Sequence, residues 1–259
     1  MADTKEKKKD GPNVVMLKGL RLNMYNDQLY YPQVELANKG KKKGCHRFNW
    51  NGKFIFPPKE SDEGKAVLQQ SRSAMKAAKS LKWGDKADEI KIKGVNTPIQ
   101  DGDDEEITTF EPMKGAYFLS ASKTVYGPKG GDEKDVPKRP FRVIGPRKVK
   151  DPETGEMKFP DMKPGDNGAP YSGCTVNVKV EFWGQDADSE RSIPNRINAT
   201  ILAVQFARDG DAFGGGGTRV DVDNEFDEED ADGDDLGDDD DFGGSSKSKP
   251  KDDDDDLGL

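Results

Sequence analysis

Residues 174–183 read CTVNVKVEFW, and this stretch decides the class of fold. Apolar residues stand at every second position from Val176 to Phe182, and Asn, Lys and Glu stand between them. Successive side chains of a β-strand point to opposite faces, so this alternation predicts a strand with one buried face and one face in water.

The sequence predicts further strands on both sides of this one, at residues 14–24, 115–123, 141–144 and 197–206. Long loops at 124–140 and 145–171 separate some of them. Five or more strands with one helix in roughly 200 residues suit a mainly β protein, and we predict an OB-fold-like five-stranded barrel with long loops. A β-sandwich is the nearest alternative.

Two local signals lie between the predicted strands at 14–24 and 115–123. Residues 46–56 predict a β-hairpin, because Asn51-Gly52 is a two-residue turn signal in which both residues tolerate positive φ. Ser61 can cap a helix that runs to about Trp83, where apolar residues recur at roughly helical spacing.

The charge of the chain is divided between two regions. Residues 221–259 hold 19 of the 50 acidic residues and three of the 41 basic ones, a net charge of −16, which leaves a net charge of +7 on residues 1–220. The acidic region has too few apolar residues to offset chain entropy, so it is predicted to be disordered. We therefore expect a flexible basic arm at 1–12, a folded barrel domain at 13–213, and a Gly hinge with a disordered acidic tail at 214–259.

No catalytic constellation is visible, so we predict that the protein is not an enzyme and binds no cofactor or metal. Cys45 and His46 are neighbours on a predicted strand and should point to opposite faces. Asp221, Asp223 and Glu225 resemble the start of a calcium loop, but Phe226 stands where such a loop needs glycine.

The sequence also indicates the cellular compartment in which the protein is expected to act. No apolar run approaches the roughly 20 residues that span a bilayer, so no membrane partner is expected. The chain has two cysteines, and isolated thiols fit a reducing cytoplasm.

Basic and aromatic residues interleave along the predicted barrel. Binding a flexible polyanion without strict sequence choice needs cations for phosphates and flat rings for bases. The residues predicted to contact single-stranded DNA (ssDNA) on this basis are Lys42, Lys43, Arg47, Trp50, Lys53, Lys123, Tyr126, Lys138, Arg139, Phe141, Arg142, Arg147, Lys148, Lys179 and Trp183.

The same pattern leaves alternatives open. Trp50, Tyr126, Phe141 and Trp183 stand beside charges or loop starts, and each either stacks on bases or packs in the barrel. Phe54, Phe56, Phe118, Phe182 and Phe206 are expected in the core. The basic residues of 134–148 either contact phosphates or belong to an ordinary solvated loop.

The acidic tail has two expected roles. A flexible tether gives an effective concentration in the mM range, so the tail can occupy the cationic groove until ssDNA displaces it. Its tip combines charge with small apolar residues and is predicted to bind partner proteins through Asp252, Asp253, Asp254, Asp255, Asp256, Leu257 and Leu259.

Several short segments occur in an order that resembles a known family. They are GAYFLSAS at 115–122, Arg139-Pro140, YSGC at 171–174 followed by VNVKV, AVQFARDG at 203–210, and KAAKSLKWGDK at 76–86. Together they are similar to the OB-fold ssDNA-binding proteins of tailed bacteriophages, especially a group known from an Enterobacter phage.

That resemblance implies an OB-fold with loop insertions, sequence-tolerant ssDNA binding, no cofactor, and a role in phage DNA replication, recombination or repair. It also implies that the tail recruits replication or recombination proteins, as in T7-type and bacterial ssDNA-binding proteins. Those tails usually end in Phe, whereas this one ends in Leu259. The alternatives are a protein-interaction or DNA-mimic module that works through the tail, and a strand-annealing recombination protein. Oligomeric state stays open.

Overall fold

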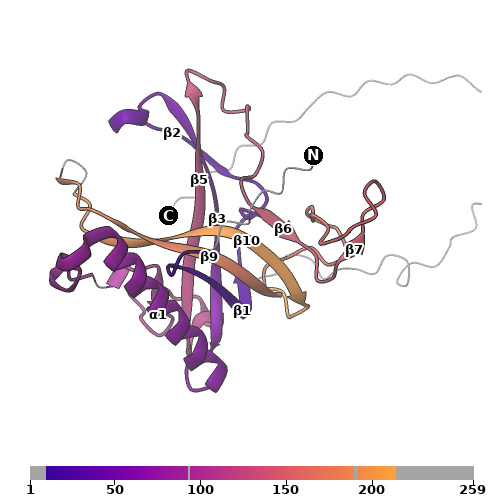
Figure 1. The fold of residues 1–259 in the computed structure, drawn as a ribbon, viewed down its shortest axis with the longest axis horizontal. Coiled ribbons are helices and arrows are strands. Elements are labelled where there is room, and N and C mark those ends of the chain that lie inside the picture. Colours follow the sequence, from indigo (N-terminus) through magenta and orange to yellow (C-terminus); the bar gives the residue numbers. More distant parts are fainter. Residues whose placement is uncertain (1–9, 93, 190–191, 214–259) are drawn as a thin grey trace, which may run out of the picture. The chain divides into compact units, whose positions relative to one another are not determined.

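The computed structural model describes residues 10–92, 94–189 and 192–213. Five long strands form the barrel: β1 (Val14–Asn23), β3 (Cys45–Pro58), β5 (Ala116–Lys129), β9 (Thr175–Gln185) and β10 (Arg196–Arg208). β1 pairs with β3, β3 with β5, β5 with β10, β10 with β9, and β9 with β1, so the ring closes (Figure 1). The β5–β10 pair is parallel and the other four are antiparallel, which confirms the predicted OB-fold-like five-stranded barrel.

The barrel closes unevenly. β3 and β5 stay paired over almost their whole length, from Cys45–Lys129 to Pro58–Ala116. β5 and β10 meet at a single register pair, Thr200 and Ser122. The long β3–β5 ribbon is therefore the most extended surface of the barrel, and the short seam beside it leaves room for a groove.

Five short strands extend or accompany the barrel. β2 (Gln33–Leu36) lies beside β3, β4 (Ile99–Asp101) beside β5, and β6 (Arg142–Ile144) parallel to β10. β7 (Val149–Lys150) and β8 (Met157–Lys158) form a separate small hairpin.

The predicted helix is confirmed as α1 (Asp62–Trp83). Ser61 caps it, because its hydroxyl accepts a 2.9 Å hydrogen bond from the Gly64 amide. A buried stripe recurs every three or four residues and includes Val67, Ala74 and Ala78. This stripe packs on the barrel core, with α1 lying along β9 and β1 (Figure 1).

The alternation in β9 places its apolar side chains in the barrel interior, where Val176, Val178, Val180 and Phe182 are fully buried. The other phenylalanines predicted in the core are buried as well: Phe54, Phe56, Phe118 and Phe206.

The predicted hairpin at 46–56 is wrong. β3 runs through Asn51 and Gly52 without a turn, and these residues pair with Ser122 and Ala121 of β5. A Cβ at position 52 would lie 3.2 Å from the Phe54 ring, which is a tight contact, and 3.5 Å from the Leu22 side chain. A glycine inside a strand often marks such a close approach, and here it imitates a turn signal.

A second, smaller core lies on the other side of the β3–β5 ribbon. Ile55 and Phe118 are cross-strand partners whose side chains point away from the barrel interior. Met113 covers them together with Phe110 and Phe213, whose rings meet edge to face at 5.4 Å. This cluster covers one end of the outer face of the ribbon.

Candidate nucleic-acid interface

The outer face of the β3–β5 ribbon carries a polar and cationic strip, which we call the β3–β5 face. It consists of four cross-strand pairs in register: Arg47–Tyr126, Asn49–Thr124, Asn51–Ser122 and Lys53–Ser120. Between these positions, the side chains of Phe48, Trp50 and Phe54 turn into the barrel and are buried. The core therefore fixes the orientation of every residue on the face.

A basic segment, Lys39–Lys43, flanks the Tyr126 end of the face. It contains the short η1 turn (Gly40–Lys42), and it borders a cavity of about 580 Å³ together with Arg47 and Tyr126. The ammonium nitrogen of Lys42 lies 5.7 Å from the centroid of the Tyr126 ring. Cationic side chains and an exposed ring, 40% accessible, thus share one cavity.

Arg47 is held by an ion pair that a ligand can exchange. Its guanidinium lies 2.7 Å from the Glu35 carboxylate on β2, and both side chains are exposed. Exposed ion pairs contribute about 0–1 kcal/mol, so replacing Glu35 by a phosphate costs little.

The face continues into a polar groove of about 340 Å³ at the β5–β10 seam. Asn51, Lys53, Ser122 and Asn198 are among the residues that line it. Asn49 and Thr124 join the groove to the Tyr126 end through a 2.8 Å hydrogen bond between their side chains. Donors and acceptors are therefore available along the whole face.

The connection between β9 and β10 is anchored to the end of α1. Asp186 accepts hydrogen bonds from the Trp83 indole at 2.8 Å and from the Lys82 ammonium at 2.6 Å. These two donors, Lys82 first, lower the pKa of the Asp186 carboxyl below its usual value. The contact positions one of the two connections that flank the nucleic-acid face in OB-folds.

Several of the predicted residues come together at this site. Arg47, Lys53 and Tyr126 lie on the face itself, and Lys42 and Lys43 lie in the basic segment. Lys123 is half-buried on β5 opposite Trp50, so its side chain starts from the inner side of the ribbon.

Two predicted stacking residues belong to the core instead. Trp50 is 1% exposed, and its indole nitrogen donates a 3.2 Å hydrogen bond to the Tyr30 carbonyl. Phe141 is buried in the same core. Neither ring offers a face to a base, because barrel and loop side chains cover both.

The remaining predicted residues lie elsewhere. Lys138, Arg139 and Arg142 border a different cavity, and Arg147 and Lys148 are exposed near β7. On β9, Lys179 pairs with Asp10 at 2.7 Å. Trp183 is 42% exposed beside Asn198, and its indole donates to the Thr200 hydroxyl at 3.0 Å.

The neutral polar residues of the face were missed from the sequence. Asn49, Asn51, Ser120 and Ser122 carry no charge and no ring, so a search for cations and aromatics passes over them. The signal that could have found them is the alternation of polar residues with large rings along 46–54, which indicates one continuous strand.

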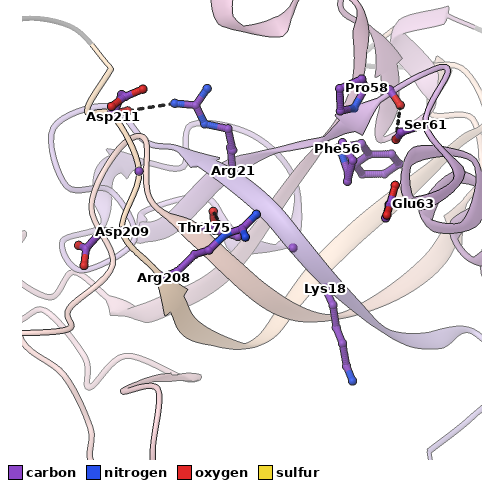
Figure 2. A pocket seen from close by; sticks show the side chains of 13 residues that line it. Lys18, Arg21, Phe56, Pro58, Ser61, Glu63, Thr175, Arg208, Asp209 and Asp211 are labelled. Carbon is purple, nitrogen blue, oxygen red and sulfur yellow. Dashed lines mark hydrogen bonds between the residues drawn. The ribbon is translucent and has the colours of Figure 1, made fainter.

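A further cavity of about 790 Å³ is lined by Lys18, Arg21 and Arg208 and by as many carboxylates (Figure 2). The three cations point in different directions, and Arg21 points toward Asp211. Arg21 donates to the Asp211 carbonyl at 3.0 Å and lies 4.2 Å from the Phe213 ring centroid. Arg21 thus anchors the segment that follows β10, and none of the residues predicted to bind DNA lines this cavity.

A closed five-stranded barrel with this connectivity and this flanked face defines an OB-fold protein. The chain belongs to the family described as "Enterobacter phage Enc34, ssDNA-binding protein", whose sequence profile matches residues 21–236. Within the described residues, no helix is long and apolar enough to cross a bilayer.

The chain is also similar to individual proteins. The chain is 29% identical over 203 residues to "Putative protein p50" of Acyrthosiphon pisum secondary endosymbiont phage 1, covering 76% of this chain and 89% of that protein. The structure of the ssDNA-binding protein of bacteriophage Enc34 in complex with ssDNA gives a TM-score of 0.48 at 18% identity, over 82% of this chain and 100% of that one. For gp2.5, a ssDNA-binding protein encoded by bacteriophage T7, the TM-score is 0.39 at 11% identity, over 83% and 98% of the two chains.

Proposed function

We propose that this protein binds ssDNA along the β3–β5 face, with sequence tolerance. The observation that carries the proposal is the uninterrupted strip from Tyr126 and the basic segment to Lys53, which lies on the face that OB-folds use for oligonucleotides. Membership of the phage ssDNA-binding family supports it.

In this proposal, Arg47, Lys53 and the lysines of the basic segment pair with phosphates. Tyr126 stacks on a base, an interaction worth about 1–3 kcal/mol that works with any base because every base has a π-face. Asn49 and Asn51 hydrogen-bond to whichever polar groups of the strand come within reach. Stacking and charge together give affinity without strict sequence choice.

The proposal is tested by titrating the full chain into labelled oligo(dT) and into duplex DNA of the same length, and following fluorescence anisotropy. We expect tighter binding to oligo(dT), because stacking on Tyr126 requires unpaired bases. Equal or weaker binding of the single strand would contradict the proposal.

The basic segment gives a first quantitative prediction. The Lys41→Gln/Lys42→Gln variant should lose two phosphate contacts, which makes the log–log salt slope shallower by about 1.4 and lowers affinity about 25-fold at 0.1 M salt. The measurement is the affinity for oligo(dT) at several salt concentrations. Lys65→Gln/Lys76→Gln, which removes two exposed charges from α1, is the matched control and should bind as the wild type does. Equal log–log salt slopes for the two variants would show that the basic segment does not contact the DNA.

We further propose that the acidic tail regulates access to this face and recruits partners in phage DNA replication, recombination and repair. Residues 214–259 lie outside the described residues, but the point from which they continue supports the idea. Phe213 packs on Phe110 in the cluster that covers Ile55 and Phe118, and these two residues are next along the ribbon after the Lys53–Ser120 pair. The acidic residues are therefore tethered at one end of the β3–β5 face, where a short tether gives a high effective concentration.

Removing residues 214–259 should tighten oligo(dT) binding about tenfold at low salt, because a tethered competitor at mM effective concentration is lost. The measurement is the anisotropy titration of the truncated chain. A full-length control with the acidic residues of 221–259 replaced by Asn and Gln should gain the same affinity, which separates charge from length. If both variants bound oligo(dT) with the affinity of the wild type, the tail would not compete with ssDNA for the β3–β5 face.

The division into a basic arm at 1–12, a barrel at 13–213 and a tail at 214–259 is part of the same proposal. So is partner binding by Asp252–Asp256, Leu257 and Leu259, which lie outside the described residues. We also propose that the protein has no cofactor and no enzymatic activity, and that it acts in the host cytoplasm.

An interaction or DNA-mimic module predicts the opposite result for the truncated chain: its activity would disappear with the tail. A strand-annealing protein would additionally accelerate pairing of complementary strands.

A further inference from the structure

A cavity of about 890 Å³ lies apart from the β3–β5 face. Tyr30 and Tyr31 form one side, and residues 138–142 and 161–164 form the other. Four cationic side chains line it, Lys138, Arg139, Arg142 and Lys163, against one carboxylate, Asp161. The charge of its walls therefore favours an anion.

Arg139 is fixed in this cavity by its neighbours. Its guanidinium lies 5.6 Å from the ring centroids of Tyr30 and of Phe141, and its Nε donates a 3.1 Å hydrogen bond to the Phe141 carbonyl. Tyr30 is itself held, because its hydroxyl donates to the Pro170 carbonyl at 2.9 Å. The cation is thus placed by buried rings and not by a carboxylate.

Among the described parts of the chain, no carboxylate lies within ion-pair distance of Arg139. Asp161, the carboxylate of the cavity, instead accepts a 2.8 Å hydrogen bond from Arg142. Burial lowers the pKa of Arg139, and the nearby Tyr30 and Asp161 act in the opposite direction. A phosphate oxygen would supply the charge-assisted hydrogen bonds that the side chain lacks.

The cavity also has a ring available for stacking. Tyr31 is 60% exposed, unlike the neighbouring Tyr30, and it stands two residues before Gln33. Gln33 is the register partner of Asn49, a residue of the β3–β5 face. At no more than about 3.3 Å per residue, Tyr31 lies within roughly 7 Å of Gln33. A strand lying on the face can therefore reach the cavity.

We infer that this cavity is a second nucleotide subsite, in which Arg139 and Lys138 bind a phosphodiester and Tyr31 stacks on its base. The inference rests on the proposed function, because the same DNA strand occupies the β3–β5 face and continues into the cavity. It assigns Lys138 and Arg139 to a subsite of their own, separate from the residues of the β3–β5 face.

The test is the affinity of the full chain for oligo(dT) strands from about 4 to about 16 nucleotides, the range of site sizes of OB-folds. Tyr31→Ala should bind the shortest bound strand as the wild type does, and the longest about 5- to 150-fold more weakly, the loss of one base stack. Lys138→Gln, at an exposed position, should show the same length dependence with a shallower salt slope.

Tyr25→Ala is the matched control: Tyr25 is 71% exposed in the same connection but does not line the cavity, and this variant should bind every length as the wild type does. If Tyr31→Ala and Lys138→Gln matched the wild type at every length while Tyr126→Ala bound weakly, the subsite would be refuted and the proposed function would stand. If Tyr126→Ala also matched the wild type at every length, the β3–β5 face itself would be refuted.

Discussion

Replacing Trp50 by alanine is expected to lower the free energy of unfolding by about 3–5 kcal/mol, the range for removing a large buried ring. The ring is 1% exposed in the main core, where the side chains of Phe48 and Phe54 are also buried. The substitution also leaves the Tyr30 carbonyl without its indole donor, which adds the cost of a buried unsatisfied acceptor. Chemical denaturation of both proteins measures the difference.

The control for this prediction is Trp50→Phe, which keeps a ring in the core. We expect it to lose less stability and to bind oligo(dT) as the wild type does, because Trp50 does not reach the β3–β5 face. If Trp50→Phe stayed fully stable but lost affinity for ssDNA, Trp50 would be a contact residue and its assignment to the core would be wrong.

Reversing two charges on the face should have the largest effect on binding. Arg47→Glu/Lys53→Glu changes the charge of the β3–β5 face by four units, equivalent to about four phosphate contacts, and should weaken oligo(dT) binding about 600-fold at 0.1 M salt. Both side chains point outward between buried neighbours, so the fold should persist. Anisotropy titrations give the affinity, and thermal unfolding checks the fold.

The matched control is Arg72→Glu/Lys76→Glu, which makes the same chemical change at two exposed positions of α1. Because long-range steering by net charge acts on both variants, the difference between them isolates contacts at the face. A similar loss of affinity in both would show that net charge, and not the face, determines binding.

The parts of the fold that follow from short-range pattern could be predicted from the sequence. The alternation in 174–183 gave β9, and Ser61 with the apolar stripe of residues 62–83 gave α1. Both patterns are local periodicities of apolar residues, every second residue in β9 and every third or fourth in α1, and the folded structure has the same periodicities of buried residues. The Asn51-Gly52 pair did not follow this rule, because it lies inside a strand, where Gly52 closely approaches the ring of Phe54.

The environment of each aromatic residue could not be predicted from its neighbours in sequence. Trp50 and Tyr126 both stand beside charged or polar residues, yet one is in the core and the other is exposed. The difference arises from register: Trp50 alternates inward with Phe48, whereas Tyr126 is paired with the outward Arg47. The covering of Phe118 by Phe213, which lies 95 positions later in the chain, depends equally on tertiary contact.

The site was partly predictable for the same reason. Clusters of lysine and arginine predicted Lys42, Lys43, Arg47 and Lys53, and the structure places these residues on or beside the β3–β5 face. The polar groove around Asn51 and Ser122 depends on the place where β5 meets β10, at the single register pair Thr200–Ser122. No local pattern encodes that meeting point.

The most direct test of the central claim is photo-cross-linking of the full chain to oligo(dT) that carries 5-iododeoxyuridine, followed by mass spectrometry of the adducts. If ssDNA lies on the β3–β5 face, adducts will appear on the peptide that contains Tyr126, and excess unlabelled oligo(dT) will remove them. Adducts confined to α1 or to the cavity around Arg21, with none on β3 or β5, would contradict the account.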